Sequence, residues 1–167
     1  AGRGACSSGH PGGPGSITHG TQLAGDGGFI LQLPEEYLPS TSYTLTLVDP
    51  ISGTQFSGFA VIPLGSDGGT IAPSEPDART RRFVCTGQGD GLTHGNSQLQ
   101  EEVGGVWTAP PATVAAASFR VTVLLGYGSF YYTFTHTIRM VPGGTPKPAT
   151  IDTTTLTTMR MTTSITT

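Results

Sequence analysis

Residues 118–140 read SFRVTVLLGYGSFYYTFTHTIRM and carry the clearest structural signal in the chain. Apolar or aromatic side chains stand at every second position of residues 118–125, and the alternation returns over residues 130–140. A period of two is typical of a strand with one buried face, and the intervening GYGS is typical of a hairpin turn. The stretch therefore predicts two paired strands, the second with one face made of Phe130, Tyr132, Phe134, His136, Ile138 and Met140.

The same alternation marks SYTLTLV at residues 42–48. No segment has a convincing helical period, and the 25 glycines and 13 prolines of this 167-residue chain disfavour helices. Seven or so short strands separated by Gly/Pro turns predict an all-β protein, an antiparallel β-sandwich. The weaker strand candidates are residues 28–34, 54–64, 81–86 and 97–110.

Charge and hydropathy exclude several classes of partner. Charged residues make up 11% of the chain and the net charge is -3, so there is no reason to expect nucleic acid or an anionic membrane as partner. No apolar run approaches the roughly 20 residues of a membrane span, and we expect no membrane insertion. The chain starts at Ala1 without methionine, which is typical of a mature exported chain, although a chain trimmed by other means looks the same.

Cys6 and Cys85 are the two cysteines, and they lie far apart in the sequence. Structural zinc sites use close pairs such as C-x-x-C, so this spacing does not indicate a metal site. In a secreted chain the usual state of two such cysteines is one disulfide, here between the Gly-rich N-terminal stretch and the body of the domain. Two buried free thiols are the alternative.

Several short motifs follow one another along the chain. They are Cys6, then Phe56, Gly58 and Phe59 within QFSGFAV, Cys85, the pair Thr93–His94, and Trp107, Ala109 and Pro110 within VWTAPP. Their order resembles the reeler domain, an extracellular immunoglobulin-like β-sandwich, over roughly residues 4–141. The resemblance implies an immunoglobulin-like fold, secretion, a Cys6–Cys85 disulfide and a role in matrix, adhesion or defence. It supplies no catalytic residues.

The titratable residues indicate neither a metal site nor an active site. His10, His19, His94 and His136 are not at ligand spacing, so we expect no metal and no cofactor. His94 belongs to the motif and is expected to bond a loop, whereas His136 is expected to be a satisfied core histidine. No serine stands in a G-x-S-x-G context and no short stretch joins Ser, His and Asp, so we expect no enzyme and no catalytic residues.

Other polar or aromatic features have structural interpretations. Trp107 is expected in the core rather than on an exposed platform for sugar. The Gly-rich segments 65–70 and 87–96 hold single aspartates, whereas calcium loops gather several carboxylates, so we expect flexible turns. The acid pairs Glu35–Glu36 and Glu101–Glu102 are expected at solvated strand edges.

The C-terminal part of the chain is expected to be separate from the sandwich. We expect the sandwich to occupy residues 1–141, a stiff Pro/Gly linker residues 142–148 and a threonine-rich tail residues 149–167. As a strand, the tail spans roughly 60 Å, more than the roughly 40 Å of a compact domain of this size. It lacks Gly, Pro and Asn after Ala149, which argues against a hairpin with itself. One face of this strand holds Ile151, Thr153, Thr155, Thr157, Met159, Met161 and Ile165.

These observations predict a structural subunit of an extracellular filament. The tail of one copy is expected to add as a donor strand to a sheet edge of the next copy, which makes a head-to-tail homo-oligomer. The alternative is a secreted monomeric module for adhesion or defence with an O-glycosylated, mucin-like tail. The candidate positions for O-linked glycans are Thr145, Thr150, Thr154, Thr158 and Thr162.

Overall fold

A computed structural model of the chain describes Cys6 and residues 20–65, 67–74, 79–85, 90–126 and 130–141. The predicted linker 142–148, the predicted tail strand and the candidate glycan positions lie outside the described residues. His10 and His19 lie outside them as well.

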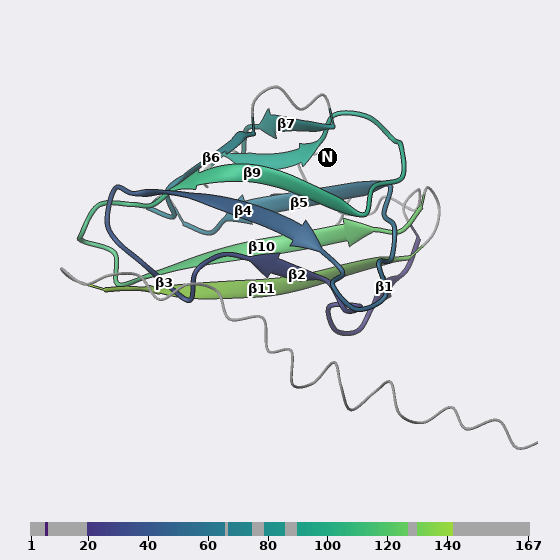
Figure 1. Cartoon of the computed structure of the whole chain (residues 1–167), viewed down its shortest axis with the longest axis horizontal. Coiled ribbons are helices and arrows are strands. Elements are labelled where there is room, and N and C mark those ends of the chain that lie inside the picture. The colour runs from purple at the N-terminus through teal and green to yellow at the C-terminus, as the bar shows by residue number, and fades with distance from the viewer. Residues whose placement is uncertain are drawn as a thin grey trace, which may run out of the picture.

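The described residues form two β-sheets that lie face to face (Figure 1). One sheet has the order β1-β11-β10-β5-β8-β7, with β3 also paired to β11, and the other has the order β2-β4-β9-β6. All pairings are antiparallel except those of β1 and β3 with β11. The predicted antiparallel sandwich is confirmed. The strands are β1 (Gln22–Leu23), β2 (Ile30–Gln32), β3 (Glu36–Tyr37), β4 (Ser42–Val48), β5 (Gly58–Pro63), β6 (Thr70–Pro73), β7 (Thr80–Phe83), β8 (Gly91–His94), β9 (Glu102–Thr108), β10 (Ala116–Leu124) and β11 (Tyr131–Met140).

The hairpin predicted from residues 118–140 is β10 and β11. Their register places Phe119 opposite His136 and Leu124 opposite Tyr131, and Leu125 N donates to Phe130 O at 3.1 Å. The predicted inner face of β11 is wrong at its first position. Phe130 is 50% exposed, and Tyr131 is buried instead, because its backbone N–H bonds Thr21 O and β1 covers this end of the strand.

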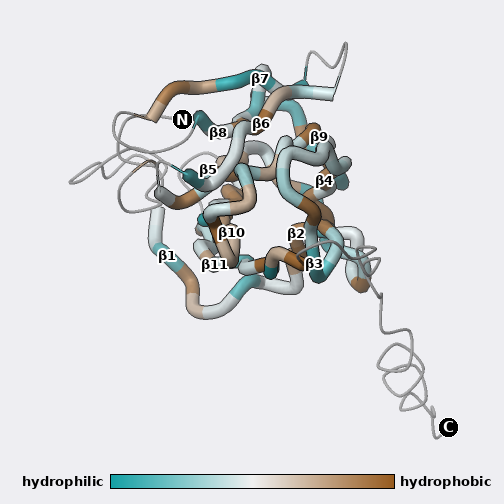
Figure 2. The backbone as a smooth tube through the Cα atoms, turned by 90° about the vertical axis from the view of Figure 1, so that its left-hand side faces the viewer, coloured by the Kyte–Doolittle hydropathy of each residue, from teal (hydrophilic) through white to brown (hydrophobic). Residues whose placement is uncertain are grey.

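Trp107 lies at the centre of the core between the two sheets, as predicted. It has no exposed surface, and its Nε1 donates to Gly68 O at 2.9 Å, which meets the need of a buried indole for an acceptor. Aromatic rings surround it at centroid distances of 5.2 Å (Tyr37), 5.8 Å (Tyr43) and 5.2 Å (Phe119). Figure 2 shows the sandwich from its side, with hydrophobic segments of both sheets around the space between them.

The two Gly-rich segments are not simply flexible turns. Residues 91–94 of the second form β8, and Gly68 of the first holds the Trp107 indole. A Cβ on Gly91 would lie 2.5 Å from the Phe83 ring and 2.9 Å from Val61 O. Glycine is therefore required there for close packing of neighbouring strands, which a sequence reading mistakes for a loop signal.

Cys6 and Cys85 are joined by a disulfide, the pairing that the family resemblance implies. With Ala60 and Ile62 the two cysteines form a small second core on one face of β5, while Phe59 and Val61 face the main core. Arg120 Nη1 donates to Cys6 O at 2.9 Å. Every residue of β5 is consequently buried. Among the described residues, no helix has the length and apolar character needed to cross a membrane.

Candidate functional site

The Thr93–His94 pair fastens β8 to β5. Thr93 Oγ1 donates to Phe59 O at 2.6 Å, and His94 Nδ1 accepts from Phe59 N at 3.3 Å. A Cβ on Gly58 would lie 3.3 Å from the His94 ring, so the lack of a side chain at the glycine of the Phe-x-Gly-Phe motif leaves room for this ring. His94 therefore bonds a strand rather than the expected loop, and its role is structural.

His136 differs from the sequence-based expectation. Its ring packs against Phe119 at a centroid distance of 6.4 Å, but its Nε2 is buried and has no hydrogen-bond partner. The expectation of a satisfied core histidine is therefore wrong for this atom. Burial lowers the pKa of His136 below its usual value, because desolvation disfavours the charged imidazolium.

A cleft opens at the side of the sandwich where β2 and β11 are the facing edges, and it is called here the β2–β11 cleft. Its volume is about 340 Å³. β1 pairs with β11 only at Tyr131–Tyr132 and β3 only at Arg139–Met140, so residues 134–138 have no described strand beside them on that side. The cleft is lined by Asp26, residues 29–33, Glu35, Phe134, Thr135 and His136.

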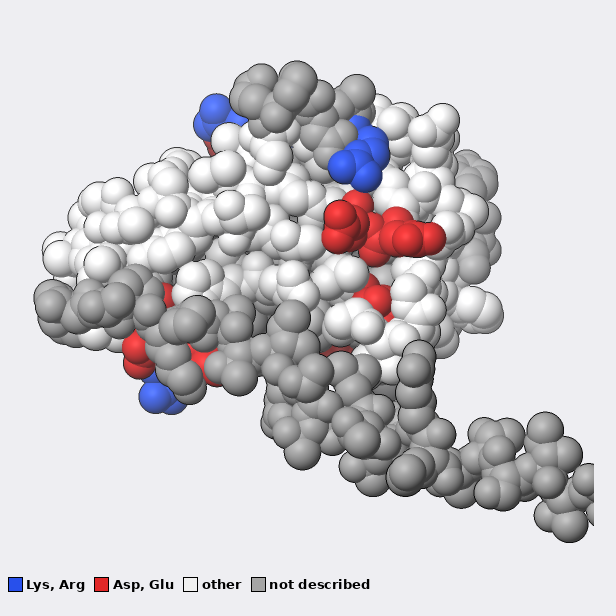
Figure 3. All heavy atoms as spheres, viewed as in Figure 1, with Lys and Arg blue, Asp and Glu red and all other residues white. Residues whose placement is uncertain are grey.

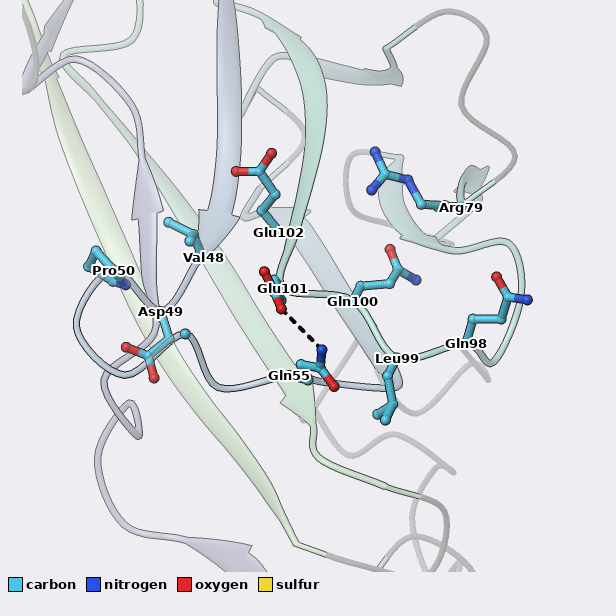
Figure 4. A pocket seen from close by; sticks show the side chains of 11 residues that line it. Val48, Asp49, Pro50, Gln55, Arg79, Gln98, Leu99, Gln100, Glu101 and Glu102 are labelled. Atoms are coloured by element: carbon cyan, nitrogen blue, oxygen red, sulfur yellow. Dashed lines mark hydrogen bonds between the residues drawn. The ribbon is translucent and has the colours of Figure 1, made fainter.

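A second, larger hollow lies between the β4–β5 connection and the segment that leads into β9, and it is called here the Gln100 pocket (Figure 4). Its volume is about 640 Å³, within the range of small-molecule sites. Its polar lining includes Asp49, Gln55, Arg79 and Gln98 with Gln100, Glu101 and Glu102. Figure 3 shows that charged side chains are few on the face drawn there and that acidic ones lie mainly right of centre and at the lower left.

Hydrogen bonds fix one wall of the Gln100 pocket. The Asp49 carboxylate accepts from the backbone N–H groups of Ile51, Ser52 and Thr54 at 3.1, 3.0 and 3.3 Å. Burial raises the pKa of the Asp49 carboxyl, but hydrogen bonds from Thr54, Ser52 and Ile51 outweigh it and leave the pKa below its usual value. The Asp49 carboxylate thus stabilises the turn at residues 49–54.

Gln100 is the unusual residue of this pocket. Its backbone N–H and C=O both pair with Phe56 at 2.9 Å, which fixes its position. The side chain is 5% exposed, and neither Oε1 nor Nε2 has a hydrogen-bond partner. Next to it, Gln55 Nε2 donates to Glu101 Oε1 at 3.1 Å (Figure 4).

Sequence reasoning missed Gln100. It treated Glu101 and Glu102 as solvated edges, and both are exposed, but they also line the pocket. The bridge between Phe56 and Gln100 joins distant segments, and no local pattern of residues predicts it. Within the described ranges, no group of three or more His, Cys, Asp or Glu side chains could hold a metal ion.

The comparisons with known proteins agree with this architecture. The family model described as Reeler domain matches residues 4–145. The crystal structure of the human F-spondin reeler domain (fragment 1) is 22% identical, with a TM-score of 0.61 over 74% of this chain and 95% of that chain. The Reelin-N domain of F-spondin is 22% identical, with a TM-score of 0.62 over 74% of this chain and 94% of that chain. No curated protein matches the chain.

Proposed function

The chain belongs to the reeler domain family, and from that premise we propose that it is a subunit of an extracellular filament. Reeler domains occur in extracellular proteins, and the Cys6–Cys85 disulfide fits an oxidising compartment. In the proposed filament, the threonine-rich segment 149–167 of one copy lies as a β-strand in the β2–β11 cleft of the next copy. The chain has a structural role in this proposal and no catalytic one.

The observation that supports this proposal is that the described strands β1 and β3 cover only the two ends of β11. Tyr131 and Arg139 direct their backbone N–H groups to Thr21 O and Glu35 O on the outer side of β11. Backbone groups of a strand alternate in direction, so those of Thr135 and Thr137 point to the same side. An edge of this kind is a template for an added strand.

The lining of the cleft suits the threonine-rich segment. Phe29, Leu31 and Leu33 give the cleft apolar walls, which suit side chains such as Met159 and Ile165. His136 Nε2 has no hydrogen-bond partner, and a threonine hydroxyl, which both donates and accepts, suits either tautomer of the ring. A segment whose one face carries both threonine and apolar side chains therefore meets both requirements.

Lengths favour a neighbour over the same copy. The stretch of β11 between its pairings with β1 and β3, residues 134–138, spans about 17 Å, against roughly 60 Å for an extended segment 149–167. The sandwich continues to Val141, whose N–H bonds Tyr37 O at 2.9 Å. A segment that leaves from there and docks on another copy makes a heterologous contact, and repetition of that contact gives an open filament.

Assembly of the purified chain tests this proposal. Light scattering after size exclusion and negative-stain images should show filaments for the full chain and monomers for a chain ending at Pro148. Met159→Asp with Met161→Asp should also give monomers, because two unpaired carboxylates would enter an apolar groove. Thr154→Asp with Thr158→Asp is the matched control, since it adds the same charges on the opposite face and should still assemble. Normal filaments from the chain ending at Pro148 would refute the proposal.

The Gln100 pocket favours a second candidate function, a monomeric adhesion or defence module that binds a ligand there. In that case the segment 149–167 is a mucin-like stalk, and the full chain remains monomeric. Under either function we propose O-linked glycans on Thr145, Thr150, Thr154, Thr158 and Thr162, because few surface charges are present to maintain solubility. An intact mass of 17.2 kDa for the chain isolated from its natural source would exclude the glycans.

A further inference from the structure

We propose that the Gln100 pocket binds a neutral sugar and that the Gln100 amide recognises its hydroxyl groups. This inference is independent of the filament, because the pocket shares no lining residue with the β2–β11 cleft. It rests on a buried amide whose hydrogen-bonding capacity is unused.

An unsatisfied buried amide is costly. Gln100 is 5% exposed and both of its amide atoms lack a partner, whereas the large majority of buried side-chain polar atoms in proteins are hydrogen-bonded. Relaxation of the backbone does not relieve this cost, since Phe56 binds the Gln100 N–H and C=O at 2.9 Å each. Gln100 lines the pocket while its two amide atoms lie beneath the surface, so a turn of the side chain toward a bound molecule would give both atoms partners.

The amide itself selects the class of ligand. Oε1 needs a donor and Nε2 needs an acceptor. A metal ion or an ammonium group satisfies only Oε1, and a sulfate or phosphate group satisfies only Nε2. A hydroxyl group is both donor and acceptor, so two adjacent hydroxyls of a sugar ring satisfy both atoms of Gln100.

The lining of the pocket favours neutral sugars over anionic ones. It holds three acidic residues, Asp49, Glu101 and Glu102, against the single cation Arg79. Glu101 and Glu102 are exposed carboxylates at the same pocket, and they accept hydrogen bonds from further hydroxyls while repelling sulfate or carboxylate groups. Leu99 also lines the pocket and is 60% exposed, which gives the C–H face of a sugar ring an apolar contact. Figure 4 shows Gln100, Glu101 and Leu99 in the same hollow.

Binding of sugars to the full chain tests the inference. The probes are the neutral sugars galactose, glucose, mannose and N-acetylglucosamine and their disaccharides, with sialic acid and a heparin disaccharide as anionic comparisons. Saturation-transfer NMR and titration of backbone amide shifts should show binding of at least one neutral sugar, with shifts at residues 98–102. Binding of none of the neutral sugars, or of the anionic sugars alone, would overturn the inference.

A matched pair of variants separates recognition from folding. Gln100→Met keeps the shape of the side chain and removes both polar atoms. It should weaken sugar binding about tenfold or more, which corresponds to two lost hydrogen bonds, while thermal stability stays equal or rises. Gln22→Met changes a glutamine outside both the pocket and the β2–β11 cleft and should leave the affinity unchanged. Full affinity in Gln100→Met would refute the role of the Gln100 amide in binding. It would mean that a buried water is the hydrogen-bond partner of this amide.

Discussion

Removal of the disulfide should cost this sandwich a large share of its stability. The change is Cys6→Ala with Cys85→Ala, which removes the disulfide crosslink between the N-terminal stretch and the body of the domain. Alanine keeps the Cβ of each residue, so the perturbation is mainly the loss of the crosslink and of two sulfur atoms from the small core around Ala60 and Ile62.

The magnitude follows from the length of the closed loop. The sequence separation of the two cysteines is 79. In the chain-entropy account a loop of about 15 residues contributes about 3 kcal/mol and one of about 100 residues about 4.7 kcal/mol, so this disulfide contributes about 4.5 kcal/mol. Domains of this size are stable by about 5–15 kcal/mol, so the variant should retain about 0.5–10 kcal/mol and lies near the threshold of folding only if the intact chain is at the lower end of that range.

Urea unfolding followed by tryptophan fluorescence measures this loss, because Trp107 is the single tryptophan and is buried. The control is the unchanged chain with its disulfide reduced, which should lose the same free energy as the double variant. A loss below about 1 kcal/mol in both would refute the reasoning. It would mean that the N-terminal stretch stays close to Cys85 in the unfolded chain without the crosslink.

Two further predictions concern single residues. Because burial lowers the pKa of His136, the unfolded state binds the proton more tightly than the folded state does. The contribution of His136 to stability is therefore full above the unfolded pKa of about 6.5 and falls as the pH drops below it. His136→Gln should flatten this part of a plot of unfolding free energy against pH, and an unchanged slope would contradict the assignment. Gly91→Ala places a Cβ 2.5 Å from the Phe83 ring and 2.9 Å from Val61 O, and it should lower the unfolding free energy by about 1–3 kcal/mol. Gly53→Gln is the surface control, at a positive φ with nothing within 4 Å of the added Cβ. It should show only the smaller cost of its backbone strain.

The strands that could be predicted are those whose side chains alternate. β4 matches the predicted range 42–48 without a shift, and β10 and β11 match within two residues of the expected ends. In these strands one face meets the core and the other meets solvent, so the sequence itself records the geometry. The alternation fails at Phe130 and Tyr131 because β1, which covers Tyr131, comes from a distant part of the chain.

The features that could not be predicted depend on contacts between distant segments. β8 consists of Gly91–His94, and its glycine is required by Phe83 and Val61 rather than by a turn. Gln100 is buried because an isolated bridge pairs it with Phe56. Neither its neighbours in sequence nor its polarity indicates burial, so a single sequence contains no local signal of this site.

The two proposed sites meet at one aromatic contact, which decides how their tests must be combined. Phe29 lines the β2–β11 cleft and packs edge-on against Phe56 at a centroid distance of 5.7 Å, and Phe56 holds the backbone of Gln100. If each site works alone, Gln100→Met loses sugar binding but keeps assembly, and Met159→Asp with Met161→Asp loses assembly but keeps sugar binding. Coupling through Phe29 and Phe56 requires that an occupied cleft change sugar affinity, and that sugar change assembly by the same factor. Sugar affinity measured on filaments and on the chain ending at Pro148 distinguishes the two cases: equal affinities exclude coupling, and unequal affinities establish it. If the aromatic contact carries the coupling, Phe56→Leu should remove the difference in affinity.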